Sequence, residues 1–336
     1  MHNQQPYTNV TNTDEEILLQ VTGLTKQYTL EKNFFLRREE KLLAVDDVSL
    51  TIHQGKTLGL VGESGCGKST LGKLVLKVEA PTAGKILFDG QDITNLKGQS
   101  LRNMRRNMQG IFQDADASLN PRMKIEDIVK ESLTNYHIGS KEERRQQVIE
   151  LLHTVGLGEE ILDRYPHEFS GGQKQRITIA RALALRPKLI LCDEATASLD
   201  VSIQAQVLNL LKKLREVFGL SYLFISHDIA AVKYISDEVA VMYLGKIVER
   251  IDSKTLIGKA RHPYTRALLQ AVPIAGGEKT LLQNKQLKGE PPNPMDIGKG
   301  CRFYSRCECR EAICNREEPP LKEVRPGHQI ACHVVA

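Results

Sequence analysis

A glycine-rich segment near the start of the chain has the composition of a phosphate-binding loop. It fits the pattern G-x-x-x-x-G-K-[ST] in full, with the residues Gly62, Glu63, Ser64, Gly65, Cys66, Gly67, Lys68, Ser69 and Thr70. The glycines let such a loop wrap a phosphate with its N–H groups pointing inward, and the following helix start adds a favourable dipole. Lys68 is then expected to reach the β- and γ-phosphates, and the Ser69 hydroxyl to hold Mg²⁺. A glycine-rich turn that matches by chance is the alternative, and the strand and helix patterns on either side disfavour it.

Two adjacent carboxylates follow a short apolar run further along the chain. Residues 189–192 are apolar, and Asp193 and Glu194 come directly after them. This order is typical of a buried strand that ends in acidic side chains. Asp193 is placed to hold Mg²⁺ through water, and Glu194 to orient or deprotonate the attacking water. Alone, the pair could equally be the N-cap of a helix. Beside an intact phosphate loop, it predicts a P-loop NTPase.

A third segment narrows the class of NTPase. Phe169 precedes the run Ser170, Gly171, Gly172 and Gln173, which an apolar helical pattern follows. In this run the chain resembles the ABC ATPase family, whose signature is L-S-G-G-Q, with Phe169 at the leucine position. The resemblance implies that the run closes over the γ-phosphate bound by another subunit, as an anion site at a helix start. A serine-glycine linker is the alternative, and the position of the run shortly before the acidic strand disfavours it.

Four further positions match the pattern of this family. The resemblance makes Gln113 the glutamine that touches Mg²⁺ and the attacking water, and residues 198–200 the loop that crosses the dimer interface. It makes His227 the switch histidine at the γ-phosphate, and Tyr28 the aromatic residue that stacks on adenine. Taken alone, His227 would suit a structural histidine and Tyr28 a half-buried strand residue. Because each site needs a signature loop from another subunit, the monomer is expected to hydrolyse ATP poorly.

The elements that must position these residues extend over residues 17–250. Short apolar runs alternate there with helical patterns, which predicts a mostly parallel α/β sheet. We expect strands at 56–61, 86–88, 108–112, 189–192 and 222–225, and helices at 69–78 and 141–153. Residues 115–169 are more polar and helix-prone, which predicts an inserted helical subdomain. The predicted fold class is therefore α/β: a P-loop NTPase (ABC ATPase) sheet domain with an inserted helical subdomain and a small cysteine-rich C-terminal extension.

Residues 251–336 are predicted to form that extension. The segments 262–269 and 289–292, together with 201–207 in the sheet domain, resemble the oligopeptide and dipeptide importer ATPases. This resemblance implies a motor for uptake of di- or oligopeptides, with nickel or another small solute as the alternative cargo. It also implies as partners two integral membrane permease subunits, a second homologous ATPase and, indirectly, an extracellular solute-binding protein.

Composition bears on the cellular location and on competing functions. The net charge of +5, from 46 Lys and Arg against 41 Asp and Glu, is too small and scattered to indicate nucleic-acid binding. No apolar run of about 18 residues predicts a membrane span, and residues 1–16 lack a signal-peptide core. We therefore expect a peripheral protein at the cytoplasmic face of the cell membrane. A soluble ABC ATPase acting on DNA or ribosomes, and a metal-binding regulator with a vestigial ATPase, are the competing hypotheses.

Five of the seven cysteines lie beyond position 300. In a reducing compartment, such a cluster indicates a metal site rather than disulfides. The spacing of Cys301, Cys307, Cys314 and Cys332 is wider than in zinc modules. It resembles the four-cysteine ligand set of an iron–sulfur cluster in the peptide-importer subfamily, which implies a 4Fe-4S cluster with a structural role. Zinc, or no metal at all, is the alternative. Outside this set, Cys309 is an extra cysteine, and His328 and His333 are weaker candidate ligands.

Overall fold

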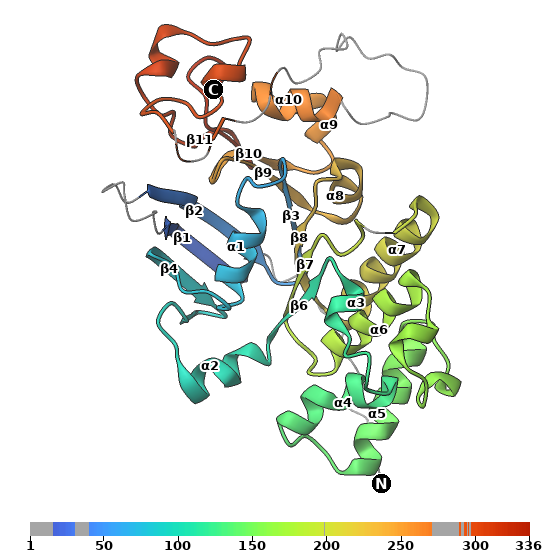
Figure 1. Ribbon diagram of the computed structural model, residues 1–336. Coiled ribbons are helices and arrows are strands. Elements are labelled where there is room, and N and C mark those ends of the chain that lie inside the picture. Colours follow the sequence, from blue (N-terminus) through green and yellow to red (C-terminus); the bar gives the residue numbers. More distant parts are fainter. Residues whose placement is uncertain are drawn as a thin grey trace, which may run out of the picture.

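The structure is a computed structural model that describes residues 16–30, 40–197, 199–270, 289, 292–293, 295 and 297–336. Two β-sheets form its centre, the helices of residues 115–183 extend to one side, and the C-terminal extension lies at the opposite end (Figure 1). No helix within the described residues combines the length and the apolarity needed to cross a bilayer.

Within the described residues the larger sheet has eight strands, in the order β11-β12-β10-β9-β3-β8-β7-β6. Its parallel part comprises β6 (Met108–Phe112), β7 (Leu189–Asp193), β8 (Ser221–Ile225), β3 (Thr57–Val61) and β9 (Glu238–Tyr243). Every residue of β3, β7 and β8 is buried, as expected for strands covered on both faces. In β8, Tyr222 and Phe224 enter one hydrophobic core, while Leu223 and Ile225 enter the other. The predicted parallel sheet is thus confirmed.

A second, antiparallel sheet was absent from the sequence prediction. In the described part of the chain it has the order β2-β1-β4-β5. Its strands are β1 (Ile17–Leu30), β2 (Glu40–His53), β4 (Ala83–Phe88) and β5 (Gln91–Asp92). The pairing of β1 with β2 shifts register at several places, so the alternation of apolar residues that marks a strand is broken. A tight turn follows β4, with Asp89 and Gly90 at φ 51 and 74.

The helix after the phosphate-loop pattern is shorter than predicted. Helix α1 spans Lys68–Val75 and buries Leu71, Leu74 and Val75 against the second sheet and the parallel strands. Val78, the last residue of the predicted 69–78 helix, lies beyond α1 and is 58% exposed. The prediction was wrong here because the chain leaves the helix before Val78, with Lys77 at a left-handed φ of 56. The end of the helix is thus set by the backbone at Lys77.

Residues 115–168 hold the helices α3 (Ala115–Ser118), α4 (Ile125–Asn135) and α5 (Lys141–Thr154) and two short 3₁₀ turns, η1 (Glu159–Ile161) and η2 (Pro166–Glu168). Helix α5 agrees with the predicted 141–153 helix. It begins with a capping box in which the Ser140 hydroxyl accepts from the Glu143 N–H while the Glu143 carboxylate accepts from the Ser140 N–H. The remaining helices of the sheet domain are α2 (Gly98–Arg105), α6 (Gly171–Leu183), α7 (Val201–Phe218) and α8 (Ile229–Ile235).

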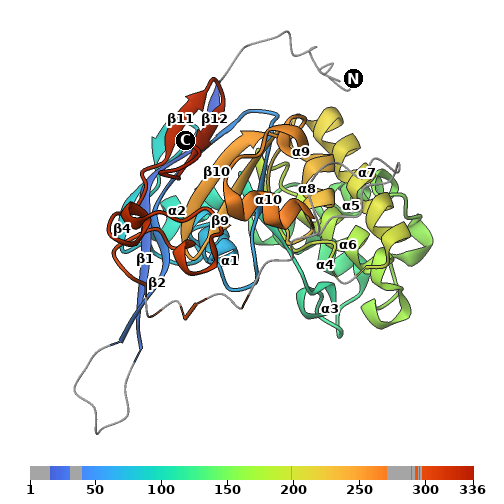
Figure 2. The same ribbon diagram turned by 90° about the horizontal axis from the view of Figure 1, so that it is seen from above.

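The C-terminal extension completes the larger sheet. Strand β12 (His328–Ile330) pairs with β10 (Lys246–Asp252) and with β11 (Lys322–Arg325), all antiparallel. The other elements of the extension are α9 (Leu256–Lys259), α10 (Pro263–Gln270), η3 (Tyr304–Arg306) and η4 (Ala312–Asn315). Seen from above, β11 and β12 lie beside β10, far from α4 and α5 (Figure 2). In the described residues, β11 and β12 of the extension therefore extend the larger sheet at the edge opposite β6.

Candidate functional site

The phosphate-loop pattern lies where β3 passes into α1. Strand β3 ends at Val61, and α1 begins at Lys68 after Gly67, which has a left-handed φ of 106. A Cβ on Gly67 would lie 2.1 Å from the carbonyl oxygen of Ala44, and one on Gly62 would lie 2.2 Å from that of Met242. Neither position can therefore carry a side chain without displacing a strand. The two glycines let the loop pack directly on β2 and β9.

A cavity of about 670 Å³ opens at this loop. Its wall is made by Tyr28, Leu42, Leu43, Ala44, Ser64, Gly65, Gly67, Lys68, Ser69, Thr70, Gln113, Glu194, His227, Leu244 and Gly245. One side is apolar, from β2 and from the turn after β9, and the other carries the polar groups of the loop. A cavity with these two sides suits a ligand that has a flat, largely apolar end and an anionic end.

The Lys68 side chain is held inside the loop. Its ammonium donates to the carbonyl oxygens of Gly62 at 2.7 Å and of Glu63 at 3.0 Å, and the residue is only 7% exposed. The thiol of Cys66 lies 3.9 Å from the same nitrogen, and burial raises the pKa of this thiol. Cys66 is therefore a packing residue under the loop, whereas Lys68 places a positive charge at the cavity wall.

Ser69 and Asp193 meet although 124 positions separate them. The Ser69 hydroxyl donates to Oδ1 of Asp193 at 3.0 Å. Burial raises the pKa of the Asp193 carboxyl, with the charge of Glu194 adding to this effect and the Ser69 hydrogen bond opposing it. A hydroxyl and a buried carboxylate side by side at a phosphate loop are the oxygen ligands that suit Mg²⁺. The chemistry of this pair therefore fits the magnesium site expected from the sequence.

Glu194 and His227 form a second pair at the cavity. Nδ1 of His227 lies 2.8 Å from Oε2 of Glu194. The two residues follow β7 and β8, which pair in parallel, so their side chains emerge at the same edge of the sheet. Glu194 has φ 52, an uncommon value for a residue with a side chain, and its N–H donates to the Ile225 carbonyl at 2.9 Å. The pair can bind a water molecule and take a proton from it.

Tyr28 and Gln113 complete the predicted residues that line the cavity. The Tyr28 hydroxyl donates to Glu79 at 2.5 Å, and the Lys26 ammonium lies 5.0 Å from the centre of the tyrosine ring. Burial, followed by the Glu79 hydrogen bond, raises the pKa of this hydroxyl. The ring is thus fixed at the apolar side of the cavity, where a planar base could stack on it.

The signature run lies away from the cavity of its own chain. Ser170 is the N-cap of α6, where its hydroxyl accepts from the Gln173 N–H at 3.4 Å and the Gln173 side chain accepts from the Ser170 N–H at 3.1 Å. None of the residues 170–173 lines the cavity. Phe169, at the family's leucine position, is buried, and the centre of its ring lies 4.7 Å from the Cζ atom of the Arg164 guanidinium. The departure from leucine is therefore a change in packing that leaves the polar run exposed.

Some predicted residues stand apart from the cavity wall, and some of the wall was not predicted. Gly62, Glu63, Cys66 and Asp193 lie behind the wall rather than in it. In the dimer-interface loop, Asp200 caps α7 through the N–H groups of Ser202 and Ile203, whereas Ser198 lies outside the described residues. The unpredicted wall residues are Leu42, Leu43, Ala44, Leu244 and Gly245. They belong to β2 and the turn after β9, where the only local signal is the glycine of a tight turn.

The four predicted cysteine ligands lie in one neighbourhood of the extension. Burial, and then the nearby thiols of Cys307, Cys314 and Cys332, raises the pKa of the Cys301 thiol to about 11. Nevertheless, the described residues contain no group of three His, Cys, Asp or Glu side chains that could hold a metal ion. The geometry therefore gives no support to the zinc alternative, and the expected 4Fe-4S cluster is also without direct support.

The two weaker candidate ligands have other partners. Nε2 of His328 lies 2.7 Å from Oε1 of Glu249, and both side chains are buried. Nε2 of His333 lies 3.0 Å from the carbonyl oxygen of Glu317. His328 is thus bonded to a residue of β10 and His333 to a residue of the extension, and a metal-binding role for either histidine stays an untested prediction.

Comparison with known proteins places these features in a family. Residues 45–197 match the ABC transporter family, and residues 248–314 match the oligopeptide/dipeptide transporter C-terminal region. The oligopeptide transport ATP-binding protein AppF of Bacillus subtilis is 47% identical over 327 residues, which cover 97% of this chain and 99% of AppF. The probable peptide ABC transporter ATP-binding protein y4tS of Sinorhizobium fredii is 46% identical over 321 residues, which cover 96% of this chain and 91% of y4tS.

Two solved structures are similar to most of this chain. The dimeric ATP-binding cassette MJ0796, in a post-hydrolysis state bound to ADP and phosphate, has a TM-score of 0.63 and is 29% identical. The match covers 70% of this chain and 99% of that one. CbiO1 of Clostridium perfringens, part of the ABC transporter complex cbiONQ, also has a TM-score of 0.63 and is 27% identical, with 73% of this chain and 92% of that chain covered.

Proposed function

Because the chain belongs to the ATP-binding subunits of the oligopeptide and dipeptide ABC transporter family, we propose that it hydrolyses ATP to power the uptake of di- or oligopeptides through a membrane importer. One observation carries the ATPase assignment: a single cavity brings together Lys68, Ser69 and the Glu194–His227 pair, with Asp193 bonded to Ser69 behind its wall. The peptide cargo rests on the family match and the relatives' names. No observation favours nickel.

In this proposal the nucleotide occupies both sides of the cavity. Tyr28 stacks on adenine, and the N–H groups of residues 62–70 and the Lys68 ammonium bind the phosphates. Lys68 exchanges its present bonds to loop carbonyls for phosphate oxygens. Ser69, Gln113 and Asp193 would hold Mg²⁺, which neutralises negative charge on the phosphates when it is bound. The main contributions of the loop are therefore positioning and charge stabilisation.

Glu194 and His227 support the hydrolytic step. The oxygen of a water molecule attacks the γ-phosphorus, the bond between that phosphorus and the β–γ bridging oxygen breaks, and ADP and phosphate leave. Glu194 orients the water and receives its proton. His227, whose Nδ1 is bonded to Glu194, orients the carboxylate and contacts the γ-phosphate with its exposed edge.

A second ATPase is required to complete the site. The Ser170–Gln173 run is exposed except for the half-buried Gly172, and it lies outside the cavity of its own chain. In this proposal it closes over the γ-phosphate held by a partner ATPase. The similar cassette MJ0796 forms a dimer. We place the ATPase pair beneath two membrane permease subunits, peripheral to the cytoplasmic face, with a solute-binding protein delivering the peptide on the other side.

The finer assignment of the extension is a 4Fe-4S cluster on Cys301, Cys307, Cys314 and Cys332. Its support is the shared neighbourhood of these thiols and the resemblance of their spacing. A cluster spreads its ligands around four iron atoms, so it does not require three side chains to converge on one point. Anaerobic purification followed by iron, sulfide and zinc assays tests this: about four iron and four sulfide per chain are expected. One zinc, or no metal, would contradict the cluster and leave the ATPase assignment intact.

The test of the main proposal is peptide uptake by the assembled transporter. The chain is purified with its permease subunits and second ATPase, reconstituted into vesicles, and supplied with the binding protein and a labelled peptide. Glu194→Gln should abolish both ATP hydrolysis by this subunit and its share of uptake while ATP still binds. Glu216→Gln, an exposed glutamate on α7, is the matched control and should change neither. Full uptake by Glu194→Gln would show that the catalytic assignment is wrong.

A further inference from the structure

The Glu63 side chain points toward the C-terminal extension rather than into the nucleotide cavity. Its carboxylate accepts a hydrogen bond from each terminal nitrogen of Arg306, with Nη1 at 2.6 Å from Oε2 and Nη2 at 3.0 Å from Oε1. Glu63 is the second residue of the phosphate loop, and 243 positions separate it from Arg306. Its neighbours Ser64 and Gly65 line the cavity, whereas Glu63 does not. The extension therefore reaches the loop from behind.

Arg306 is itself held in place on several sides. Its side chain is only 5% exposed, and its guanidinium lies 5.9 Å from the ring centre of Tyr243 and 6.0 Å from that of Phe303. The Tyr243 hydroxyl is a further hydrogen-bond partner at 3.5 Å. A planar guanidinium in a fixed orientation donates two parallel hydrogen bonds to a carboxylate. A lysine ammonium cannot reproduce this geometry.

A second residue of the extension holds the backbone at the same position. The hydroxyl of Tyr264, in α10, accepts from the Glu63 N–H at 2.9 Å. Tyr264 is fully buried, with its ring centre 4.6 Å from that of Tyr243 and 5.4 Å from that of Phe303. Both the side chain and the backbone of Glu63 are thus fixed by one aromatic cluster. The carbonyl oxygen of Glu63 in turn accepts a hydrogen bond from the Lys68 ammonium.

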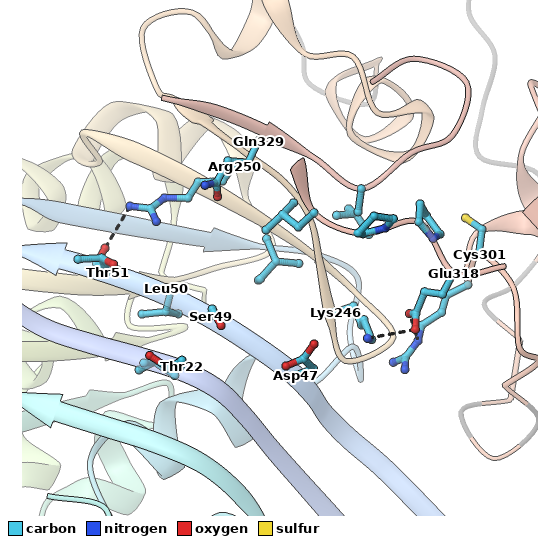
Figure 3. Close-up of a pocket in the computed structure, with 18 of the residues that line it drawn as sticks. Thr22, Asp47, Ser49, Leu50, Thr51, Lys246, Arg250, Cys301, Glu318 and Gln329 are labelled. Carbon is cyan, nitrogen blue, oxygen red and sulfur yellow. Dashed lines mark hydrogen bonds and ion pairs between the residues drawn. The ribbon is translucent and has the colours of Figure 1, made fainter. Parts of the chain in front are cut away.

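Other ion pairs attach the extension elsewhere and do not touch the phosphate loop. Lys246 lies 3.1 Å from Glu318, and Arg302 contacts Asp46. Figure 3 shows this region, a cavity of about 740 Å³ that is lined by Asp47, Lys246, Cys301 and Glu318, with Glu318 facing Lys246. These pairs anchor the extension on β2 and β10, and so they serve as controls for a role that is specific to Arg306.

We propose that Arg306 is a positioning residue for the nucleotide site: by binding the Glu63 carboxylate, it holds the phosphate loop in its ATP-binding conformation and turns a negative charge away from the phosphates. The inference rests on the proposed ATP site. Without Arg306, an unpaired carboxylate within the loop repels the triphosphate. Movement of Glu63 also displaces the carbonyl to which Lys68 is bonded.

The test uses the complete transporter complex and compares kcat with KM for ATP. Arg306→Ala is expected to raise KM for ATP about five- to tenfold while kcat changes less than about twofold, because the interaction affects binding of the phosphates more than the hydrolytic step. Arg306→Lys should restore only part of the affinity. Glu318→Gln, which breaks an ion pair of the same extension away from the loop, should leave both constants unchanged.

A double-mutant cycle separates positioning from general stability. Glu63→Gln should raise KM less than Arg306→Ala does, because it loosens the loop but removes the carboxylate that repels the phosphates, and the double variant should be no worse than Arg306→Ala. Glu63→Gln leaves every residue of the extension in place, so it answers the question even if Arg306→Ala fails to assemble. Unchanged KM in both single variants, or effects that add in the double variant, would overturn the inference. Lys68→Ala tests the ATP site independently, since retained ATP binding there would overturn the proposed function instead.

Discussion

The Nδ1 atom of His227 lies 2.8 Å from the Oε2 atom of Glu194, and both residues line the nucleotide cavity. The two residues meet because Glu194 directly follows β7, His227 comes two residues after the end of β8, and these parallel strands are neighbours. A histidine that holds the carboxylate facing the phosphates should matter for turnover more than for binding. We therefore expect replacement of His227 to reduce the turnover of ATP without reducing the affinity for ATP.

His227→Ala should lower kcat for ATP hydrolysis by about one to two orders of magnitude, the size associated with loss of a group that orients an acid–base residue. The affinity for ATP should change little, since the loop and Lys68 are untouched. Steady-state hydrolysis by the complex and equilibrium binding of a fluorescent ATP analogue measure the two effects. His153→Ala, an exposed residue of α5, is the control. A loss of affinity equal to the loss of turnover would contradict the role.

Ser69→Ala should raise the Mg²⁺ concentration needed for half-maximal hydrolysis. The change removes one expected metal ligand and the hydroxyl that donates to Asp193 at 3.0 Å. Asp193 is then left buried without that donor, which lowers the free energy of unfolding by about 1–3 kcal/mol for a group of this kind. Titration of activity against Mg²⁺ at saturating ATP is the measurement. An unchanged Mg²⁺ requirement would rule out Ser69 as a ligand.

Gly171→Ala should fold normally yet impair the assembled transporter. A Cβ at Gly171 lies 3.6 Å from the nearest atom of Leu199, an ordinary contact, so the chain can accept the methyl group. In the complex the same methyl group would face the γ-phosphate of the partner subunit, where it should slow hydrolysis about tenfold or more. Unfolding temperature and ATPase activity should thus diverge. Gly258→Ala, with no atom within 4 Å of its added carbon, is the control, and equal activity of both variants would argue against a trans site.

The extension should loosen as the pH falls below neutrality. His262 is 1% exposed, its Nδ1 accepts from the Tyr264 N–H at 3.1 Å, and burial lowers its pKa to about 4. An unfolded histidine titrates near 6.5, so between about pH 6.5 and pH 4 the unfolded chain binds a proton that the folded chain does not. Stability is therefore lost as pH falls through this window, by about 2 kcal/mol at pH 5 relative to pH 7.5.

His262→Asn tests this prediction, because its side-chain oxygen can accept the Tyr264 N–H and does not titrate. Denaturant unfolding at pH 7.5, 6 and 5 should show a shallower loss of stability in the variant than in the parent chain. Parallel curves would assign the acid sensitivity to other groups.

Some features of the site could be predicted because their signals are local. The phosphate loop, the acidic strand end and the signature run each occupy consecutive residues whose types already state their chemistry. Strands β3, β7 and β8 were equally predictable, since strands covered on both faces appear as uninterrupted apolar runs. The antiparallel sheet was missed because register shifts break the period of β1 and β2.

The sequence by itself determined which groups are available for chemistry and that they belong to an ABC transporter ATPase. Only the tertiary structure decided which of them meet: Ser69 with Asp193, Glu194 with His227, and Glu63 with Arg306. It also decided that the signature run lies outside its own cavity and that both tail histidines have hydrogen-bond partners. The physical reason is that motif chemistry is carried by neighbouring residues, whereas distances between distant residues depend on strand order and on the packing of the extension against the loop.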